Sequence, residues 1–392
     1  MSFNEIRGRQ TNLIMAGIMC IWFTACGAAE EAEPVAYDYK ELMQPITVSS
    51  SDIYDEAGQS EYQEQDGTSD IDMDEQDNVI EVTISAAGDV TLGNYLNQNY
   101  SYSFDQTYEQ TEDKKYFFEN VYDIFSADDF TVVNLEGPLT DSGEIRQEKE
   151  YVIKGKPEYA QLLKYGAIEA AGLANNHILD YKEQGLLDTV QALDEQGIAY
   201  AYDSNVGIYN VGEVKIGYVA VSQVSRGNAM EKTLQNGIET LQEEEADIIL
   251  VLCHWGIERE FYPEEYQRYL GKLCIDWGAD IVLGSHPHVL QGIEEYNGKF
   301  IVYSMGNFCF GGNRNPADKD SMIFQQTFTF VDGEKQSDAN IRVIPCSISS
   351  VSERNNYQPT PSVGSEAERI IDRINEYSSD FGVEFDYDGY LK

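Results

Sequence analysis

The side chains best suited to chemistry in this sequence are its four histidines. They occupy three short segments: Asn175-Asn176-His177, His254-Trp255-Gly256 and Gly284-Ser285-His286-Pro287-His288. Each segment follows an apolar run typical of a buried strand, and small residues beside the histidines leave room for a ligand. Two further apolar runs end in the same way at Asp89 and Glu136. Imidazoles and carboxylates gathered at strand ends are what a divalent metal centre requires, so the sequence predicts such a centre.

Each of these motifs also has a structural interpretation when it is taken alone. Asp89 could lie in a turn, Glu136 could be a satisfied polar strand end, and His254 could be a hydrogen-bonded core histidine. Residues 286–288 form the most specific motif, because an extended His-x-His pair places both imidazoles on the same side. Together, the motifs fall at the carboxyl ends of separate predicted strands. Ligands of open α/β sheets bind at that end, which favours one shared site.

The elements that must position these residues alternate along the chain. Apolar runs and period-two alternation predict strands at residues 79–87, 130–135, 167–174, 247–253, 280–283, 300–305, 323–330 and 341–348, and a hairpin at 208–221. Helical spacing predicts helices at residues 181–196, 229–245, 263–277 and 366–377. Strand–helix alternation with late hairpins indicates an α/β domain built on mixed sheets.

The composition limits the classes of partner. The chain has 392 residues with 69 acidic and 26 basic side chains, a formal net charge of −43. This balance offers no basic surface for phosphates, so nucleic acid is excluded as a partner. It also argues against simple attraction to anionic lipid. The charge could serve solubility alone, or it could keep a polyanion moving past the surface.

The N-terminus predicts a lipoprotein signal peptide over residues 1–26. Arg7 and Arg9 form a short basic region, and the apolar run at 13–23 is too short to span a bilayer as a helix. The small residues before Cys26 resemble a bacterial lipobox, which predicts lipidation of Cys26 and an extracytoplasmic protein anchored to the bacterial cell membrane. Plain secretion and an uncleaved anchor are the alternatives.

Beyond the signal peptide, the sequence predicts three regions. Residues 27–79 are rich in Asp, Glu, Ser and Gln and read as an acidic disordered tether. Residues 80–350 form the ordered domain, and residues 351–392 a C-terminal helical extension. The cysteines outside the signal peptide are Cys253, Cys274, Cys309 and Cys346. They lack CxxC spacing and are expected to be buried thiols, with one disulfide as the alternative.

The order of the motifs resembles the CapA family of bacterial capsule synthesis, or poly-γ-glutamate biosynthesis, proteins. The resemblance covers about residues 80–350 and includes every histidine. It is carried by Gly88-Asp89-Val90-Thr91-Leu92-Gly93, Val133-Asn134-Leu135-Glu136-Gly137-Pro138, Leu173-Ala174-Asn175-Asn176-His177 with Asp180-Tyr181, His254-Trp255-Gly256 with Glu258, Gly284-Ser285-His286-Pro287-His288-Val289-Leu290-Gln291-Gly292 and Tyr303-Ser304-Met305-Gly306-Asn307-Phe308.

The resemblance implies a fold similar to calcineurin-like metallophosphatases, a four-layer sandwich of two mixed β-sheets flanked by helices. It implies one or two divalent metal ions (Mn, Fe or Zn) at the strand ends, and His177 as general acid or transition-state donor. The implied metal ligands are Asp89 and His288 for the first ion, Glu136 as the bridging carboxylate, and Asn176, His254 and His286 for the second. The implied supporting groups are Asn134, Glu258 and Asn307.

One departure from the phosphatase pattern bears on the number of ions. Those enzymes commonly carry Asp-x-His in the first motif, whereas this chain has Asp89-Val90-Thr91. The first site therefore has one imidazole fewer, which leaves open whether both ions bind.

The function implied is a metal-dependent hydrolase of the phosphoesterase type that acts in capsule or poly-γ-glutamate biosynthesis at the cell surface. The alternatives are a non-catalytic assembly or export component, and a metal-dependent amide hydrolase acting on the polymer. The expected partners are an anionic polymer or phosphoester substrate and membrane-bound capsule synthesis subunits.

Overall fold

The computed structural model describes residues 47–49, 78–147, 149, 151–337 and 340–392. All of them belong to one compact unit, Tyr39–Lys392. The predicted signal peptide with Cys26 lies outside the described residues, as does the predicted tether except for residues 47–49 and 78–79. Within the described residues, no helix combines the length and apolarity needed to cross a membrane.

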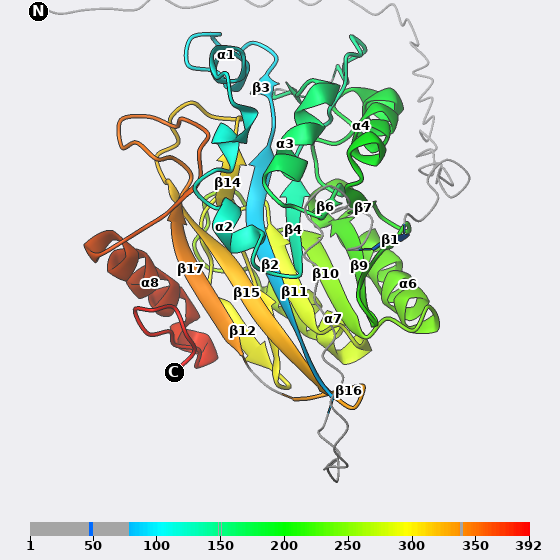
Figure 1. Ribbon diagram of the computed structural model, residues 1–392. Coiled ribbons are helices and arrows are strands. Elements are labelled where there is room, and N and C mark those ends of the chain that lie inside the picture. The colour runs from blue at the N-terminus through cyan, green and yellow to red at the C-terminus, as the bar shows by residue number, and fades with distance from the viewer. Residues whose placement is uncertain (1–46, 50–77, 148, 150, 338–339) are drawn as a thin grey trace, which may run out of the picture. The chain divides into compact units, whose positions relative to one another are not determined.

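The first of two large sheets is mixed (Figure 1). Its seven strands are, in spatial order, β1 (Thr47–Ser49), β8 (Gly207–Val211), β9 (Val214–Ser222), β10 (Ile248–His254), β11 (Ile281–Ser285), β13 (Lys299–Val302) and β12 (Ile293–Tyr296). The central neighbours β9, β10, β11 and β13 are parallel. The pairs β8–β9 and β12–β13 are antiparallel.

The second large sheet is also mixed, and it carries the start of the domain. Its nine strands are β18 (Thr360–Pro361), β17 (Ile341–Ser347), β15 (Asp320–Val331), β2 (Val79–Thr91), β4 (Phe130–Leu135), β6 (Ala170–Gly172) and β7 (Ala199–Ala201) in spatial order, with β14 (Asn307–Phe310) beside β2 and β16 (Glu334–Lys335) beside β15. The strands β2, β4, β6 and β7 are parallel. A separate ribbon pairs β3 (Asn94–Tyr95) with β5 (Ile153–Lys154).

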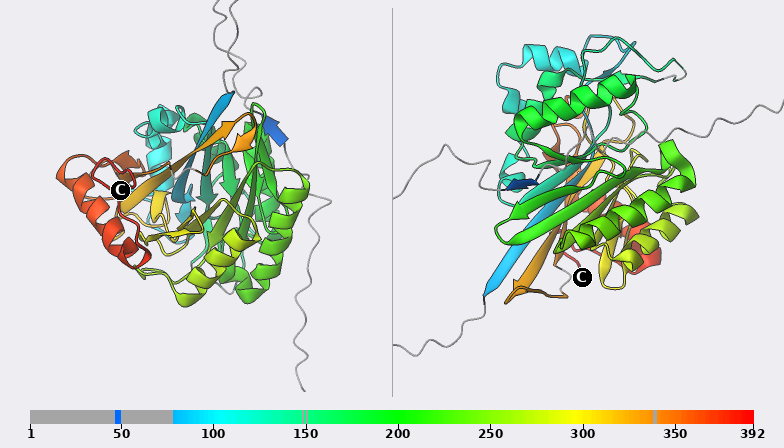
Figure 2. Two further views of the ribbon diagram at one scale, coloured as in Figure 1. Left: turned by 90° about the horizontal axis from the view of Figure 1, so that it is seen from below. Right: turned by 90° about the vertical axis from the view of Figure 1, so that its right-hand side faces the viewer.

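Helices flank the two sheets, as Figure 2 shows from two further sides. The α-helices are α1 (Phe104–Gln110), α2 (Tyr122–Phe125), α3 (Ala160–Tyr165), α4 (Lys182–Gln196), α5 (Gln223–Arg226), α6 (Met230–Glu243), α7 (Glu265–Trp277) and α8 (Ser365–Ser378). The 3₁₀ turns are η3 (Lys114–Phe117), η4 (Pro157–Tyr159), η5 (Gly227–Ala229) and η6 (Ser379–Phe381).

Local sequence sets where two of the longer helices begin and end. A capping box starts α7, since the side chain of Glu264 accepts from a backbone N–H and Gln267 reciprocates. The helices α4 and α7 end at Gly197 and Gly278, which have φ values of 72° and 119°. That left-handed conformation favours glycine, so both stops could be predicted from the sequence.

The core explains why the strands of the first sheet read as unbroken apolar runs. Along β10, Leu250 and Leu252 pack in the main core with side chains of the second sheet, whereas Ile249 and Val251 pack in a second cluster with α6 and α7. Strands buried on both faces are apolar throughout. The two sheets approach closely near the site, because a Cβ on Gly172 of β6 would lie 3.0 Å from Leu252 Cδ1.

The predicted fold class, two mixed sheets flanked by helices in an α/β domain, is confirmed. The strand predicted at 167–174 is wrong in extent, since only β6 is extended; α3 ends just before it and Ala167 has a left-handed φ of 53°. Residues 47–49, placed in the predicted tether, form β1 beside β8. The C-terminal residues are part of the packed unit, because Tyr357, Ile371 and Ile374 are fully buried in the main core.

Candidate metal centre

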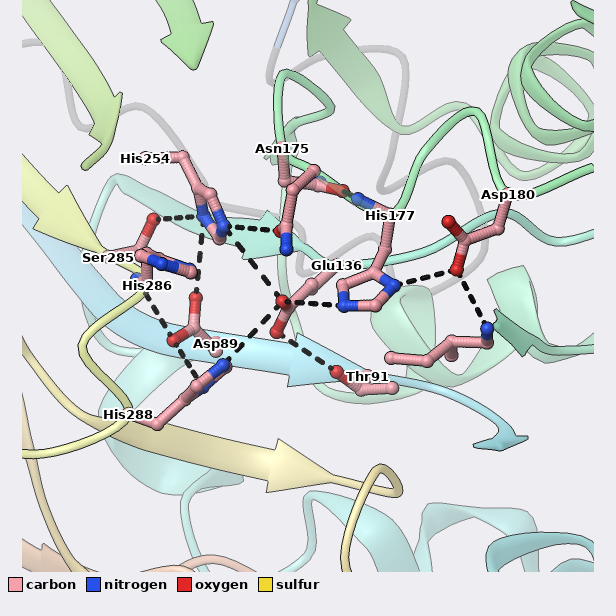
Figure 3. Close-up of polar contacts among 12 residues, drawn as sticks. Asp89, Thr91, Glu136, Asn175, His177, Asp180, His254, Ser285, His286 and His288 are labelled. Atoms are coloured by element: carbon pink, nitrogen blue, oxygen red, sulfur yellow. Dashed lines mark hydrogen bonds and ion pairs between the residues drawn. The ribbon is translucent and has the colours of Figure 1, made fainter. Parts of the chain in front are cut away.

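The polar residues predicted from the motifs meet where strands of both sheets end. Asp89 lies near the end of β2, Glu136 directly follows β4, and His177 follows β6 in the second sheet. The first sheet supplies His254, the last residue of β10, and His286, which follows β11. Figure 3 shows these side chains pointing toward one another. Neither sheet alone could build this arrangement, so its geometry depends on how the two sheets pack.

The carboxylate of Glu136 is the centre of the cluster. Its Oε1 lies 3.9 Å from His177 Nε2, 3.9 Å from His254 Nε2 and 3.8 Å from His288 Nε2. These distances are too long for hydrogen bonds. For His254 and for His288 they suit a ligand that shares an ion with Glu136, because bonds of 2.0–2.2 Å place two ligand atoms roughly 3–4 Å apart. His177 faces the same oxygen but belongs to neither ligand group.

An unpaired atom at the same point supports this interpretation. Glu136 is buried, and its Oε1 has no hydrogen-bond partner among the described residues. His286 Nδ1 is likewise buried without a partner. A buried acceptor without a partner costs about 1–3 kcal/mol, and more when it is charged. A divalent ion would satisfy both atoms, so the residues present fit a metal.

Two overlapping ligand groups share Glu136. One contains Asp89, Glu136 and His288, and the other contains Glu136, His254 and His286. In each group the ligand atoms lie within 4.8 Å of one another. These are the two sets that the family resemblance implies for the first and second ions, with Glu136 between them.

The other predicted ligands lie at the edge of these groups. Asn176 Oδ1 is 2.9 Å from His254 Nε2, beside the second group. The exposed side chain of Glu258 forms a third possible group with His286 and His288. The structure thus brings every predicted site residue of the ordered domain together, and their roles as ligands stay predictions.

Hydrogen bonds hold the ligands of the first group in place. Asn134 Nδ2 donates to Asp89 Oδ1 at 2.7 Å, and the backbone N–H of His286 donates to Asp89 Oδ2 at 3.2 Å. His288 Nδ1 lies 2.9 Å from Asn307 Oδ1 and 3.2 Å from Asp89 Oδ2. With Nδ1 held by these oxygens, Nε2 of His288 is the nitrogen directed at Glu136, as an orienting partner requires.

The backbone of the His286–Pro287–His288 segment differs from the extended conformation predicted for it. His286 has a φ of 96° and His288 a φ of 57°, both left-handed. Contacts explain how the strained loop is held: Asp89 accepts from His286, and the carbonyl of Pro287 accepts from Arg259 at 2.8 Å. Such strain is typical of functional sites. The two rings still lie close, with centroids 5.7 Å apart.

The surroundings set the protonation of the imidazoles. Burial lowers the pKa of His286 to about 4 and that of His254 well below its usual value. Both are therefore neutral near pH 7, the form that binds metal. Burial alone would lower the pKa of His288, but the carboxylates of Glu136 and Asp89 outweigh it and raise that pKa to about 10. An ion binding there would displace a proton from His288.

His177 is positioned from outside the ligand groups. Its Nδ1 lies 2.6 Å from Asp180 Oδ2, and Lys149 Nζ forms an ion pair with Asp180 Oδ1 at 2.8 Å. The opposite ring nitrogen, Nε2, faces Glu136. The loop that carries His177 is fixed by Asn175, whose Nδ2 donates to the Leu135 carbonyl at 2.8 Å and whose Oδ1 accepts from the His177 N–H at 3.1 Å.

Three functional neighbours were missed by sequence reasoning. Lys149 lies in a polar segment without a motif, and it became visible only through its contact with Asp180. Ser285 stands beside His286 in the sequence, yet its Oγ lies 3.0 Å from His254 Nδ1. Thr91, noted only as a departure, donates from Oγ1 to Glu136 Oε2 at 3.4 Å. Thr91 therefore contacts the Glu136 carboxylate, where the phosphatase pattern has an imidazole.

Comparison with known proteins identifies the family. Residues 83–312 match the family described as "Bacterial capsule synthesis protein PGA_cap". The chain belongs to this family. The match contains every histidine and all the predicted metal ligands.

Named relatives are similar to part of this chain. The PGA biosynthesis protein CapA of Bacillus subtilis (strain 168) is 33% identical over 249 residues, 58% of this chain and 63% of that protein. The capsule biosynthesis protein CapA of Bacillus anthracis is 28% identical over 272 residues, 62% of this chain and 63% of that protein. The chain thus spans less than two thirds of either relative.

More distant similarities were also found. A probable polyglutamine synthesis accessory protein of Mycobacterium tuberculosis (strain ATCC 25618 / H37Rv) is 28% identical over 211 residues, 46% of this chain and 56% of that protein. Among solved structures, a hypothetical protein from Thermus thermophilus aligns with a TM-score of 0.43 at 16% identity, covering 67% of this chain and 98% of that one.

Proposed function

We propose that this chain is a divalent metal-dependent hydrolase of the phosphoesterase type that acts in the biosynthesis of a capsule polymer or poly-γ-glutamate. The observation that carries the proposal is the unpaired, buried Oε1 of Glu136, which lies 3.8–3.9 Å from three imidazole nitrogens at the strand ends of two sheets. The PGA_cap family and the names of its relatives support the biosynthetic setting.

In this proposal the residues have separate roles in metal binding and proton transfer. Asp89, Glu136 and His288 would hold one ion, and His254, His286 and Asn176 would complete a second site around Glu136. Bound ions of this kind polarise a phosphoryl oxygen and supply a nucleophile at neutral pH. His177 can then give a proton from Nε2 to the leaving oxygen, while Asp180 holds the ring in place through its contact with Nδ1.

The cellular setting is part of the same proposal. The lipobox-like segment at Cys26 supports a mature chain anchored by lipid to the outer face of the bacterial cell membrane. There it would meet an anionic polymer or phosphoester substrate and membrane-bound capsule synthesis subunits. Globomycin treatment, which blocks lipoprotein signal cleavage, tests the anchor: accumulation of the unprocessed chain is expected, and unchanged processing would contradict lipidation at Cys26.

The direct test of the hydrolase measures metal and turnover together. The full chain, purified without chelators, is expected to carry one or two transition-metal ions, and the His286→Ala variant fewer. It is expected to hydrolyse bis(p-nitrophenyl) phosphate, and the His177→Ala variant should lose turnover while keeping its metal. Absence of metal in the wild type would contradict the proposal that the chain is a metal-dependent enzyme. Cleavage of a γ-glutamyl polymer alone would change the reaction to amide hydrolysis.

The relatives favour one second candidate, a non-catalytic accessory component of the polymer machinery. It is supported by the Mycobacterium tuberculosis relative, which is named as an accessory protein. Bound metal without turnover of phosphoesters or polymer, combined with loss of capsule in a deletion strain, would favour this candidate over the hydrolase.

A further inference from the structure

The loop between β10 and α7 brings one further carboxylate to the candidate metal centre. Residues 257–262 of this loop are all exposed. A carboxylate oxygen of Glu258 lies within 4.8 Å of a ring nitrogen of His286 and of a ring nitrogen of His288. His288 belongs to the first ligand group and His286 to the second. Glu258 therefore reaches both groups from the exposed side of the centre, whereas Glu136 joins them from a buried position.

The Glu258 carboxylate is available to bind an ion. Among the described residues, none forms a hydrogen bond or an ion pair with it. The neighbouring side chain of His286 is only 5% exposed, and its Nδ1 also has no partner in the part of the chain that the structure describes. A divalent cation would satisfy both groups at once, because carboxylate oxygens and neutral imidazoles are both metal ligands.

The backbone beside Glu258 is held in an uncommon conformation. Arg259 has a left-handed φ of 66°, which residues other than glycine rarely adopt. Its N–H donates at 2.8 Å to the carbonyl of Pro287, the residue between the two imidazoles. The carbonyl of Glu260 accepts from Gln291 Nε2 at 2.8 Å. The loop is thus bonded to the segment that carries the imidazoles, and strained backbone of this kind is typical of functional sites.

Helix α8 supports the outer end of the same loop. The ring of Phe261 stacks on that of Tyr377 with centroids 5.6 Å apart, and Tyr262 packs edge-on against Tyr377 at 5.4 Å. The guanidinium of Arg373 lies 5.6 Å from the centroid of Phe261 and pairs with Asp318 Oδ2 at 2.7 Å. The loop backbone is therefore fixed on both sides of an exposed carboxylate that no bond holds.

The charge of the centre favours a third carboxylate at this point. Asp89 and Glu136 are the carboxylates of the first two ligand groups. Together with neutral imidazoles, they leave a net positive charge when two divalent ions bind, and that charge attracts an anion from the exposed side. Glu258 supplies such an anion from the protein itself. A phosphoryl oxygen clamped between two ions would need the same position.

We propose that Glu258 is a displaceable ligand that closes the exposed side of the metal centre, and that an anionic substrate takes its place there. This role rests on the metal binding of the proposed function, and it does not require that a phosphoester is hydrolysed. It also goes beyond the supporting role that the family resemblance implies for Glu258, because the carboxylate itself binds the ion. Glu258 should therefore raise the affinity for the cation and lower the affinity for an added anion.

The first measurement is metal affinity. The full chain is stripped with EDTA, freed of the chelator and dialysed against Mn²⁺ or Zn²⁺, and elemental analysis gives the bound ion. The Glu258→Gln variant is expected to bind about tenfold more weakly. The Glu258→Asp variant keeps the charge but has a shorter side chain, so it should be weakened as well. Glu260→Gln is the matched control, since it removes an exposed charge from the same loop and lies in no ligand group.

The second measurement is the binding of inorganic phosphate to the metal-loaded proteins by titration calorimetry. At saturating metal, Glu258→Gln is expected to bind phosphate about three- to tenfold more tightly, because the wild type must first release its own carboxylate. Glu260→Gln should match the wild type. Weaker metal binding combined with tighter phosphate binding is a result that local damage to the site would not produce. Thermal melts establish that all variants are folded.

The outcomes separate this role from the hydrolase. Selective loss of metal affinity in both Glu258 variants, with tighter phosphate binding in Glu258→Gln, supports the role even if no phosphoester is turned over. Unchanged affinity in Glu258→Asp, or equal loss in Glu260→Gln, overturns it even if turnover is present, because charge alone would then act. Unchanged or weaker phosphate binding in Glu258→Gln overturns displacement by an anion. A wild type that binds neither ion contradicts both this role and the hydrolase.

Discussion

The imidazole of His177 lies between two carboxylates with different tasks. Asp180 contacts Nδ1 at 2.6 Å, and Glu136 lies 3.9 Å from Nε2. The Asp180 contact fixes the orientation of the ring, so that Nε2 faces Glu136. Lys149 pairs with the other oxygen of Asp180, which keeps that buried carboxylate compensated.

Replacing Asp180 with Asn tests this pairing at nearly constant shape. We expect kcat for a phosphodiester to fall by about 10²-fold or more, because general acid catalysis contributes about 10²–10⁴-fold. Metal content should stay near that of the wild type, since Asp180 is not in either ligand group. Steady-state kinetics and elemental analysis are the measurements. Loss of metal together with activity would show that Asp180 acts on the fold of the site instead.

At the scale of elements, the position of Asp89 depends on the contact between β2 and the residue before β14. The Asp89 N–H donates to the Gly306 carbonyl at 2.9 Å. A Cβ on Gly88 would lie 1.9 Å from that same oxygen, which is backbone and cannot turn aside. Gly88 is therefore a site where a methyl group would separate the two strands.

The Gly88→Ala variant is expected to lose about 1–3 kcal/mol of unfolding free energy, as overpacked sites do. Its metal content should also fall, because Asp89 moves with the strand. Urea unfolding and elemental analysis measure the two effects. Gly143→Ala is the control, since a Cβ there would meet nothing within 4 Å. Equal stability of the two variants would contradict the close contact.

Sequence patterns predicted most of these elements, and the exceptions have physical causes. The hairpin at 208–221 became β8 and β9, and the helix at 229–245 became α6, because period and turn chemistry are local properties. The two-residue strands β3 and β5 had no detectable period. They nevertheless pair residues 94–95 with residues 153–154.

Some residues of the candidate site could likewise be predicted from the sequence, and others could not. The ligand types at strand ends could be predicted, because histidines are rare in this chain and each follows an apolar run. Lys149 could not be predicted as a site residue. It takes part in the site through its contact with Asp180, which lies far along the chain, beyond α3 and β6. The left-handed φ values of His286 and His288 were equally hidden, since they depend on tertiary hydrogen bonds to Asp89 and Asn307.

At the scale of the whole molecule, burial of acidic groups away from the site makes stability depend on pH. Burial raises the pKa of Glu169 to about 8, and its Oε2 accepts from the Thr131 N–H at 2.8 Å. An unfolded Glu titrates near 4.3. Between these values the folded state binds more protons, so the free energy of unfolding falls as pH rises from about 4.5 to about 8.

Glu169→Gln keeps the acceptor and removes the titration. The wild type should lose more unfolding free energy than the variant between pH 5.5 and pH 8.5, by about 1–3 kcal/mol. Chemical denaturation in EDTA at both pH values measures this, with the metal linkage removed. The exposed Glu353→Gln is the control. A variant with the same pH dependence as the wild type would mean that Glu169 is ionised in the folded protein.

The C-terminal residues pack into the same unit as the rest of the domain, whereas an appended extension would lie outside its core. Ile370, Ile371 and Ile374 of α8 belong to the main core, and Tyr357 packs edge-on against Phe104 with ring centroids 5.4 Å apart. Two guanidinium groups of α8, on Arg369 and Arg373, also bind Asp320 of β15. A chain that ends at residue 350 would expose the apolar partners of all these side chains.

We therefore expect a chain ending at residue 350 to be insoluble or to melt at a much lower temperature, because each large buried side chain lost costs about 2–5 kcal/mol. Expression yield and a thermal melt of the full chain and the shortened chain measure the effect. The full-length His286→Ala variant is the control, since it should lose metal while keeping α8 packed. A shortened chain with the melting temperature of the full chain would show that the domain is complete without α8. That result would support the boundary at residue 350 that the sequence predicts.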